Sequence, residues 1–261
     1  MPKVRLGVAL LVPAPFAQEV DGLRRAVGDG SLGRIPAHLT LVPPVNVNRE
    51  RLPDALRVLR EAAAATRPFT VSTGAPDTFL PDNPVLYLPV EEGAPEIEAL
   101  RDRVFQDPLA RSLRWPFVPH ITIADEAAPE RIAAAKLALA DYRFTATFER
   151  VHLLEQTEGR IWRAIADAPF EEPAVVGRGG LHTELSVTTI LDPEASAIAD
   201  LGDHRGAIVV TARRDGRVVG VLVGSAEDPK HRVESVAVIP EVSDEGIEDH
   251  LLGAFNWQAS K

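Results

Sequence analysis

The chain has 261 residues, 45% hydrophobic and 25% charged, with 28 Lys and Arg against 38 Asp and Glu and no cysteine. This composition is typical of a folded globular protein, and it excludes disulfide bonds and zinc sites with thiolate ligands. Residues 1–170 carry 20 basic and 22 acidic side chains, whereas residues 171–261 carry 8 basic and 16 acidic ones. We therefore expect no continuous basic surface for long duplex nucleic acid, although this charge balance is compatible with a local phosphate site.

The N-terminal residues faintly resemble a secretory signal, because Lys3 and Arg5 precede a short apolar run. That run, Leu6 to Val12, is at the lower end of the usual signal length, and its β-branched residues favour a buried strand. No other segment approaches the roughly 20 apolar residues of a membrane span. We therefore expect a cytoplasmic protein without a membrane partner.

The first 170 residues alternate between strand and helix patterns. Apolar side chains at helical spacing predict helices over 20–27, 52–63, 95–104 and 129–139. Runs rich in β-branched residues predict strands over 4–12, 37–42, 69–73, 85–90, 117–124, 144–154 and 160–166. The order strand, helix, strand occurs once in each half, which predicts an α+β fold with two similar lobes.

The periodicity lapses after residue 167, where prolines and then glycines interrupt the pattern. We therefore predict a linker at 171–180 between a domain at 1–170 and a smaller one at 181–261. The second domain is expected to hold strands over 182–191, 206–213, 217–225 and 232–239 and a helix from about 245. Asp215-Gly216, between two of these strands, predicts a tight hairpin.

A repeated His-x-Thr pattern carries the candidate chemistry. In His38-Leu39-Thr40-Leu41 and in His120-Ile121-Thr122-Ile123, a strand would place the polar pair on one face and the apolar pair on the other. Two such strands facing each other would bring two imidazoles and two hydroxyl groups into one cleft.

That set of groups suits phosphoester cleavage. One histidine accepts a proton from the attacking water or hydroxyl, and the other donates a proton to the leaving oxygen. The hydroxyls of Thr40 and Thr122 would bind the phosphate oxygens, with His38 and His120 as the acid/base pair and no metal or cofactor. The alternative is coincidence, in which two half-buried histidines happen to share strands with threonines.

The segments 35–44 and 117–123 around these motifs resemble the two signature strands of the 2H phosphoesterase superfamily, also called 2′-5′ RNA ligase-like proteins. Residues 150–156 and 159–162 are similar to the closing hairpin of that family. The resemblance implies a bilobed, pseudo-symmetric α+β fold and metal-independent chemistry on 2′,3′-cyclic or 2′-5′-linked nucleotide phosphodiesters. It also implies that His38 and His120 act as acid and base and that Thr40 and Thr122 bind phosphate.

One departure from the family concerns the residues after the second motif. Many members carry a basic residue there, whereas this chain has Asp125 and Glu126. The substituted acids argue against affinity for long RNA, so the expected partner is a small nucleotide or an RNA end.

Further residues are weaker candidates. Arg34 is a possible phosphate contact or a solvated turn residue, and Tyr87 is a possible accessory residue that stacks a base or packs in the core. Trp115 and Phe117 are likewise expected either to stack a base or to pack in the core. His152 is expected to be structural. Four other histidines show no metal-ligand spacing and are expected at the surface: His182, His204, His231 and His250.

In the last 81 residues, a β-hairpin is followed by Val238-Ile239-Pro240-Glu241, which leads into Gly246-Ile247 and Leu251-Leu252. With this pattern, residues 181–261 resemble a partial GCN5-related N-acetyltransferase fold, in which a helix N-terminus holds the pyrophosphate of acetyl-CoA. The family's Arg/Gln-x-x-Gly-x-Gly/Ala loop would put Ser243 at the basic position, Gly246 at the first glycine and Glu248 at the second. The acids Asp244, Glu245 and Asp249 crowd the same turn. We therefore expect a degenerate α/β module that packs or dimerises through an open sheet edge.

Three functions remain open from the sequence. The leading one is a metal-independent phosphodiesterase. The second is a protein that binds a nucleotide or an RNA end without turnover. The third is acetyl transfer by the C-terminal domain.

Overall fold

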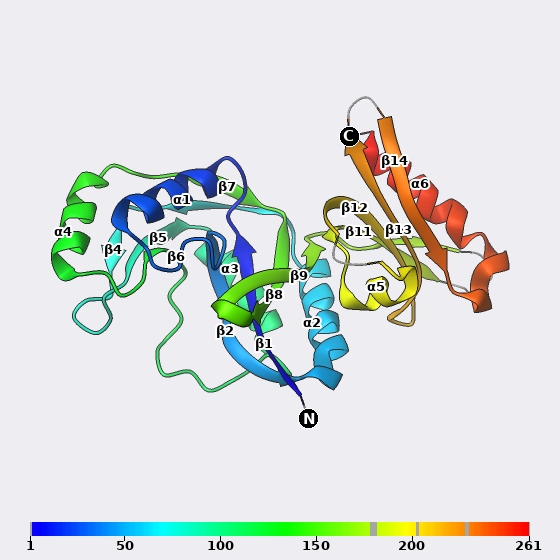
Figure 1. Ribbon diagram of the computed structural model, residues 1–261, viewed down its shortest axis with the longest axis horizontal. Helices are drawn as coiled ribbons and strands as arrows, with labels where there is room; N and C mark the ends of the chain where they lie inside the picture. The colour runs from blue at the N-terminus through cyan, green and yellow to red at the C-terminus, as the bar shows by residue number, and fades with distance from the viewer. Residues whose placement is uncertain (1, 178–181, 202–203, 228–229, 261) are drawn as a thin grey trace.

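The computed structural model describes residues 2–177, 182–201, 204–227 and 230–260, which form two antiparallel sheets side by side (Figure 1). The larger sheet has the strand order β7-β3-β5-β6-β2-β1-β8-β9, with β4 paired to β5. Its strands are β1 (Lys3–Leu11), β2 (His38–Asn48), β3 (Phe69–Thr73), β4 (Asp77–Thr78), β5 (Leu86–Glu92), β6 (His120–Ala124), β7 (Thr145–Phe148), β8 (Arg150–Thr157) and β9 (Ile161–Pro169).

Two similar lobes meet at the centre of this sheet. Strands β2, β1, β8 and β9 form one lobe, and β6, β5, β3 and β7 form the other, so the two His-x-Thr strands are direct neighbours. They bridge at the pair Leu39 and Ile121, both fully buried. The alternation expected of a half-buried strand is therefore present: apolar side chains enter the core and the polar ones face away from it.

Four helices flank the larger sheet: α1 (Phe16–Val27), α2 (Leu52–Ala64), α3 (Ala94–Val104) and α4 (Pro129–Ala138). Helix α1 follows β1 of the first lobe but contacts β6 of the second, and α3 follows β5 of the second lobe but contacts β2 of the first. The contacts use apolar residues three or four apart, as an amphipathic helix requires. On α3 these buried residues are Ile97, Leu100 and Val104.

The smaller sheet has the order β10-β11-β12-β13-β14. Its elements are β10 (Ala174–Val176), β11 (Thr183–Ile190), α5 (Pro193–Ala199), β12 (Arg205–Arg214), β13 (Arg217–Glu227), β14 (Lys230–Val238) and α6 (Ile247–Ala259). Val210 and Leu222 pack with α6 residues, whereas Val209 and Val223 pack with α5 residues, so the two helices cover opposite faces of the sheet. Both Asp215 (φ 49°) and Gly216 (φ 76°) have positive φ, as the predicted hairpin turn requires.

The structure differs from the sequence expectations at several boundaries. Strand β6 begins at His120 rather than 117, because Pro119 has no N–H to donate to a neighbouring strand. Strand β10 lies within the segment expected as a linker and pairs with Thr183–Leu185 of β11. Helix α5 was not expected; it is short, and the Asp192 side chain caps it by accepting from the backbone N–H of Ala195. No helix in the described parts of the chain is long and apolar enough to span a bilayer.

A buried carboxylate joins the two sheets. The side chain of Asp167 on β9 is fully buried and accepts hydrogen bonds from the backbone N–H groups of Thr189 (3.1 Å) and Ile190 (3.0 Å) on β11. The Thr189 hydroxyl (3.1 Å) and the Arg150 guanidinium also donate to it. Because these donors come from both sheets, Asp167 fixes their relative placement.

Candidate active site

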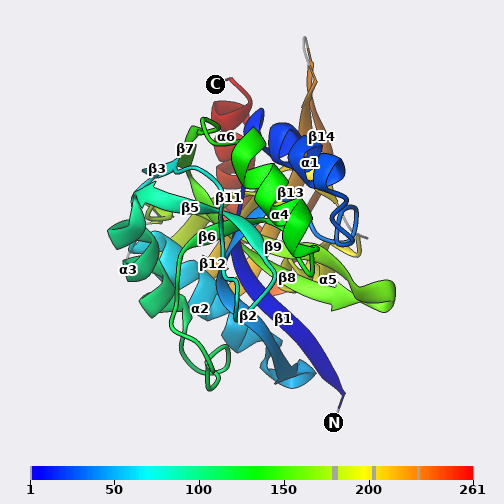
Figure 2. The ribbon, with the colours of Figure 1, turned by 90° about the vertical axis from the view of Figure 1, so that its left-hand side faces the viewer.

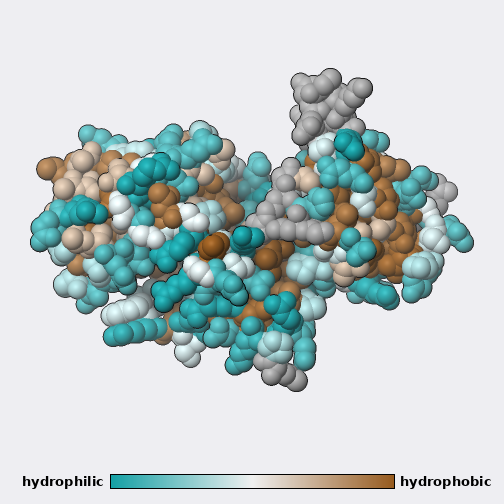
Figure 3. All heavy atoms as spheres, viewed as in Figure 1, coloured by the Kyte–Doolittle hydropathy of each residue, from teal (hydrophilic) through white to brown (hydrophobic). Residues whose placement is uncertain are grey.

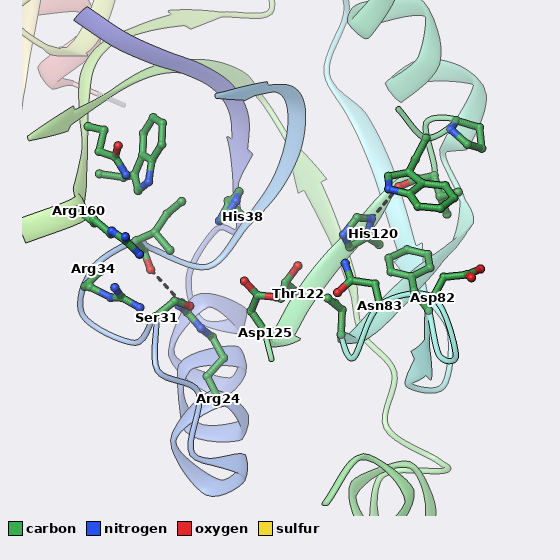
Figure 4. A pocket seen from close by; sticks show the side chains of 18 residues that line it. Arg24, Ser31, Arg34, His38, Asp82, Asn83, His120, Thr122, Asp125 and Arg160 are labelled. Carbon is green, nitrogen blue, oxygen red and sulfur yellow. Dashed lines mark hydrogen bonds between the residues drawn. The ribbon is translucent and has the colours of Figure 1, made fainter. Parts of the chain in front are cut away.

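A cavity of about 630 Å³ lies beside the strands that carry the two His-x-Thr motifs (Figure 4). The side chains that line it come from both lobes and from the β8–β9 hairpin. They are Arg24, Ser31, Arg34, Ile35, His38, Phe79, Asp82, Asn83, Val85, Trp115, Pro116, Val118, His120, Thr122, Asp125, Gln156, Arg160 and Trp162.

His38 and His120 have equivalent surroundings. The ring Nδ1 of His38 lies 2.8 Å from the Pro36 carbonyl, and the ring Nδ1 of His120 lies 2.7 Å from the Val118 carbonyl. A carbonyl oxygen only accepts, so each neutral imidazole carries its proton on Nδ1. Nε2 is therefore the nitrogen that can exchange a proton with a bound molecule.

Burial is the main influence on both imidazoles. It lowers the pKa of His38 from 6.5 to about 4, with further lowering by the positive charge of Arg24 and by His120, against a raising hydrogen bond to Pro36. It also lowers the pKa of His120, again against a backbone hydrogen bond. Both imidazoles are therefore neutral at pH 7 in the free protein.

The two threonines differ in their access to the cavity. Thr122 lines the cavity, whereas Thr40, half-buried on β2, is not among its lining residues. Strands β2 and β6 are antiparallel and bridge at Leu39 and Ile121, so Thr122 lies on the side of His38 and Thr40 on the side of His120. Of the two threonines that the sequence predicts as phosphate ligands, the structure therefore places Thr122 at the cavity and leaves Thr40 outside its lining.

Arg24 is a lining residue that sequence reasoning missed. It is 3% exposed and donates to the carboxylates of Asp29 (2.9 Å) and Asp21 (2.8 Å), the Ile35 carbonyl (3.0 Å) and the Ser31 hydroxyl (3.1 Å). These bonds hold the loop between α1 and β2 that carries Arg34. In the sequence, Arg24 appeared only as one of two adjacent arginines on a helix, which gave no signal of burial.

The β8–β9 hairpin brings a second group of residues to the cavity. The hairpin projects outward from the larger body (Figure 2), and the backbone N–H of Trp162 donates to the Arg34 carbonyl at 2.7 Å, which ties the hairpin to the loop that follows α1. Gln156, Arg160 and Trp162 of this hairpin line the cavity together with Arg34. The sequence identified the hairpin but assigned no role to Arg160.

Tyr87, predicted as a possible accessory residue, packs behind His120. It is 7% exposed, is not among the lining residues, and stacks on Phe79 with ring centroids 4.1 Å apart. Both rings make edge contacts with the His120 imidazole, with centroids 5.2 Å away for Tyr87 and 5.1 Å away for Phe79. This aromatic pair limits the orientation of His120, and burial raises the pKa of the Tyr87 hydroxyl.

The two other aromatic candidates, Trp115 and Phe117, differ in their access to the cavity. Trp115 lines the cavity and is 57% exposed, so its ring is accessible to a ligand. Phe117 is instead partly buried beneath the Arg101 guanidinium, which lies 4.4 Å from its ring centroid. Of the two, only Trp115 is placed to stack a base.

Among the histidines whose side chains the structure describes, only His38 and His120 line the cavity. His152 is buried on β8, and burial lowers its pKa to about 4. His182 is exposed, and His204 and His250 are partly exposed, while the side chain of His231 lies outside the described residues. Within the described ranges, no three His, Asp or Glu side chains are grouped to hold a metal ion.

Comparison with known proteins covers the part of the chain that forms this site. A Bacillus cytotoxicus protein that is named as a phosphoesterase on the basis of inference is 31% identical to this chain over 161 residues. The match covers 61% of this chain and 92% of that protein. A similarly named Bacillus mycoides protein is 29% identical over the same proportions.

A solved structure has a similar fold over the same part of the chain. The structure of Escherichia coli LigT complexed with NADP+ matches with a TM-score of 0.50 and 16% identity, covering 66% of this chain and 99% of that one. The model of the 2′-5′ RNA ligase superfamily matches residues 12–160. Since these residues span both lobes and both His-x-Thr strands, the chain belongs to the 2′-5′ RNA ligase superfamily, the 2H phosphoesterases.

Proposed function

We propose that the protein hydrolyses 2′,3′-cyclic nucleotide phosphodiesters, with His38 and His120 as the acid/base pair. The observation that carries this proposal is the equivalent setting of the two imidazoles, each with Nδ1 bound to a carbonyl and both lining one cavity. The pair can bracket a phosphorus atom, and Thr122 can donate to one of its oxygens.

One proton must be shared between the two histidines for the reaction to proceed. Both are neutral in the free protein at pH 7, so one takes up a proton as the phosphodiester anion binds beside it. The neutral Nε2 then accepts a proton from water as the water oxygen bonds to phosphorus. The protonated Nε2 donates to the ribose oxygen as its bond to phosphorus breaks, which leaves a phosphomonoester and a hydroxyl.

The nucleoside can be placed by the shape of the ribose. In a 2′,3′-cyclic nucleotide the phosphate lies on one face of the sugar, and the base and C5′ leave from the other face in different directions. With the phosphate between the histidines, we place the base on the exposed ring of Trp115, a lining residue of the segment that leads into His120. C5′ would then point toward the His38 side.

Hydrolysis of adenosine 2′,3′-cyclic phosphate in the presence of EDTA, followed by phosphorus NMR, tests the proposal. We expect a single phosphomonoester product from the wild type and a loss of at least about 100-fold in kcat for His38→Ala and for His120→Ala. His182→Ala, which removes an exposed histidine outside the cavity, is the matched control. Activity that survives either cavity substitution would overturn the two-histidine mechanism.

Binding without turnover is the competing function for the same cavity. Calorimetry that detects nucleotide binding, together with no product after long incubation, would favour it. Binding and turnover should be measured near pH 6 as well as at pH 7. Both imidazoles are neutral at pH 7, and a missing proton would suppress turnover without abolishing binding.

For the C-terminal sheet we propose no acetyl-CoA-dependent activity, although the acetyltransferase-like topology remains a prediction. Glu248 and Asp249 occupy the first turn of α6, where a diphosphate would have to bind, and Glu245 pairs with Arg214. Carboxylates at this position oppose an anionic ligand. Saturable binding of acetyl-CoA in calorimetry would overturn the proposal.

We also propose that the C-terminal sheet mediates self-association. Within the described residues β14 pairs with β13 alone, and apolar surface gathers over the body that holds β14 and α6 (Figure 3). Val233 and Trp257 are among the exposed apolar side chains. Light scattering at high concentration tests this, and a monomeric mass would count against it.

A further inference from the structure

The cavity has a division of charge that the two-histidine chemistry does not use. Arg34 and Arg160 lie together on one side of the cavity, while Asn83 lies beside His120 on the opposite side and Asp82 lies farther out (Figure 4). Within the described residues, neither arginine side chain has an ion-pair or hydrogen-bond partner. Two cationic groups are therefore available to a ligand at one end of the cavity only.

The two arginines are held together by the fold rather than by chance proximity of mobile side chains. The backbone hydrogen bond from Trp162 to Arg34 ties the loop after α1 to the hairpin that carries Arg160. Arg160 itself has a φ of 58°, in the left-handed region that glycine or asparagine adopts more easily. The fold thus keeps a strained arginine at the rim of the cavity, as functional positions often do.

Arg24 does not compete for the same role. It is buried, and two carboxylates, Asp21 and Asp29, neutralise it, so its contribution is to hold the loop in place. Arg34 and Arg160 have no such neutralising partners within the described residues. Their uncompensated charge is what an anionic group would meet.

Acidic side chains disfavour an anion elsewhere in the cavity. Asp125 lies between the two histidines and Arg24 of helix α1, and Asp82 lies at the far end beside Asn83 (Figure 4). A second phosphate placed next to either carboxylate would be repelled by its negative charge. A ligand with two phosphates therefore has one favourable orientation, with its second phosphate toward Arg34.

We propose that Arg34 and Arg160 form a subsite for a second phosphate of the substrate, attached to the 5′ oxygen of the nucleoside that carries the cyclic phosphate. This inference rests on the proposed function, because it fixes the orientation of the nucleotide from the phosphate between the histidines. Two guanidinium groups on separate elements bind a phosphate through charge-assisted hydrogen bonds, which favours it over the hydroxyl of an unphosphorylated nucleoside.

The same chemical group occurs in two kinds of molecule. A mononucleotide can carry a terminal 5′-phosphate, and an RNA end carries an internucleotide phosphate at the same 5′ oxygen. The first has nearly two negative charges and the second has one. Substrates of both kinds therefore distinguish the source while testing the same subsite.

The experiment compares kcat/KM for three substrates. These are adenosine 2′,3′-cyclic phosphate, its 5′-phosphorylated form, and the 3′-5′-linked RNA dinucleotide of two adenosines that ends in a 2′,3′-cyclic phosphate. We expect the wild type to prefer a second phosphate by about tenfold or more at low ionic strength, with a smaller preference in high salt. A larger preference for the mononucleotide would identify a terminal phosphate, and a larger preference for the dinucleotide an RNA end.

Substitution then assigns the preference to residues. In the double variant Arg34→Gln, Arg160→Gln we expect the kcat/KM ratio to fall to within about twofold of unity. Arg25→Gln, which removes an exposed arginine next to Arg24 but outside the cavity, should retain the wild-type ratio. Equal kcat/KM values in the wild type, or a preference that survives the double substitution, would overturn the subsite.

A binding measurement separates this inference from the proposed reaction. If no substrate is hydrolysed, the proposed function fails, and calorimetry with adenosine 3′-monophosphate and adenosine 3′,5′-bisphosphate decides the subsite. Binding of the bisphosphate that is about tenfold tighter in the wild type, and not in the double variant, would support it. Equal affinity, or binding of neither compound, would overturn it.

Discussion

Leu39 of β2 and Ile121 of β6 face each other at the centre of the larger sheet, and both are fully buried. Because the strands are antiparallel, this pair places His38 on the side of Thr122 and His120 on the side of Thr40. Each histidine therefore has the hydroxyl of the opposite lobe as its neighbour across the strands. The geometry of the site depends on the contact between the lobes as much as on either lobe.

The lowered pKa values predict activity that favours acid pH. Burial lowers the pKa of His38 to about 4 and also lowers that of His120, while the proposed reaction requires one proton on the pair. Protonated free enzyme becomes scarce above these pKa values, so kcat/KM should reach its maximum below pH 6.5 and fall by about tenfold per unit above it. The bound phosphodiester anion favours the protonated imidazole, so the maximum of kcat should lie at higher pH. A flat kcat/KM profile from pH 7 to 9 would contradict this.

The two threonines should be unequal in catalysis. Thr122 lines the cavity and can donate to a phosphate oxygen, whereas Thr40 is not among the lining residues. Loss of one such donor typically costs about 10²- to 10³-fold in kcat, which we expect for Thr122→Val. The isosteric substitution Thr40→Val is the comparison and should have the smaller effect. Equal losses in the two variants would mean that the hydroxyls act symmetrically.

Tyr87 is expected to act on His120 through its ring and not through its hydroxyl. Tyr87→Phe keeps the edge contact with the imidazole and should retain kcat within about twofold, whereas Tyr87→Leu should lower kcat by about tenfold. The leucine variant also admits water beside His120, so the pKa of that histidine should rise toward 6.5 and the pH maximum should move upward. Proton NMR titration of the His120 ring measures this shift, and a similar effect of both substitutions would assign the role to the hydroxyl.

Asp167 should contribute strongly to the stability of the whole chain. Asp167→Ala leaves the N–H groups of Thr189 and Ile190 and the guanidinium of Arg150 without their acceptor. Removing one partner from such a buried network costs about 3–5 kcal/mol in the free energy of unfolding, which urea denaturation would measure. Glu172→Ala, which removes an exposed acid nearby, is the control and should change stability by less than about 0.5 kcal/mol. A variant as stable as the wild type would show that Asp167 does not hold the sheets together.

The sequence was most informative where a local pattern has one physical solution. The alternation in His38-Leu39-Thr40-Leu41 can only place the imidazole and hydroxyl on one face of a strand, and Asp215-Gly216 suits only a tight turn. Both features are present in the structure. The positions of the core strands followed from the same kind of pattern.

The sequence was less informative where a role depends on distant neighbours. Arg24 is buried because Asp21, Asp29 and Ser31 surround it, and no spacing rule indicates such a cluster. Arg160 reaches the cavity only because the β8–β9 hairpin contacts the loop after α1. Tyr87 looked like a candidate for base stacking until the structure placed its ring against His120, on the side away from the cavity lining.

The crossed contacts of α1 and α3 have a consequence for how this protein can be divided. Each helix belongs by connectivity to one lobe but covers the histidine strand of the other. A cut between the lobes would remove α1 from β6 and α3 from β2, exposing apolar residues such as Ile121 and Leu39 in both fragments. Neither fragment would keep a closed core, so the two lobes could not have functioned as independent proteins with this arrangement of helices. The repeat in this fold is a unit of symmetry without being a unit of folding.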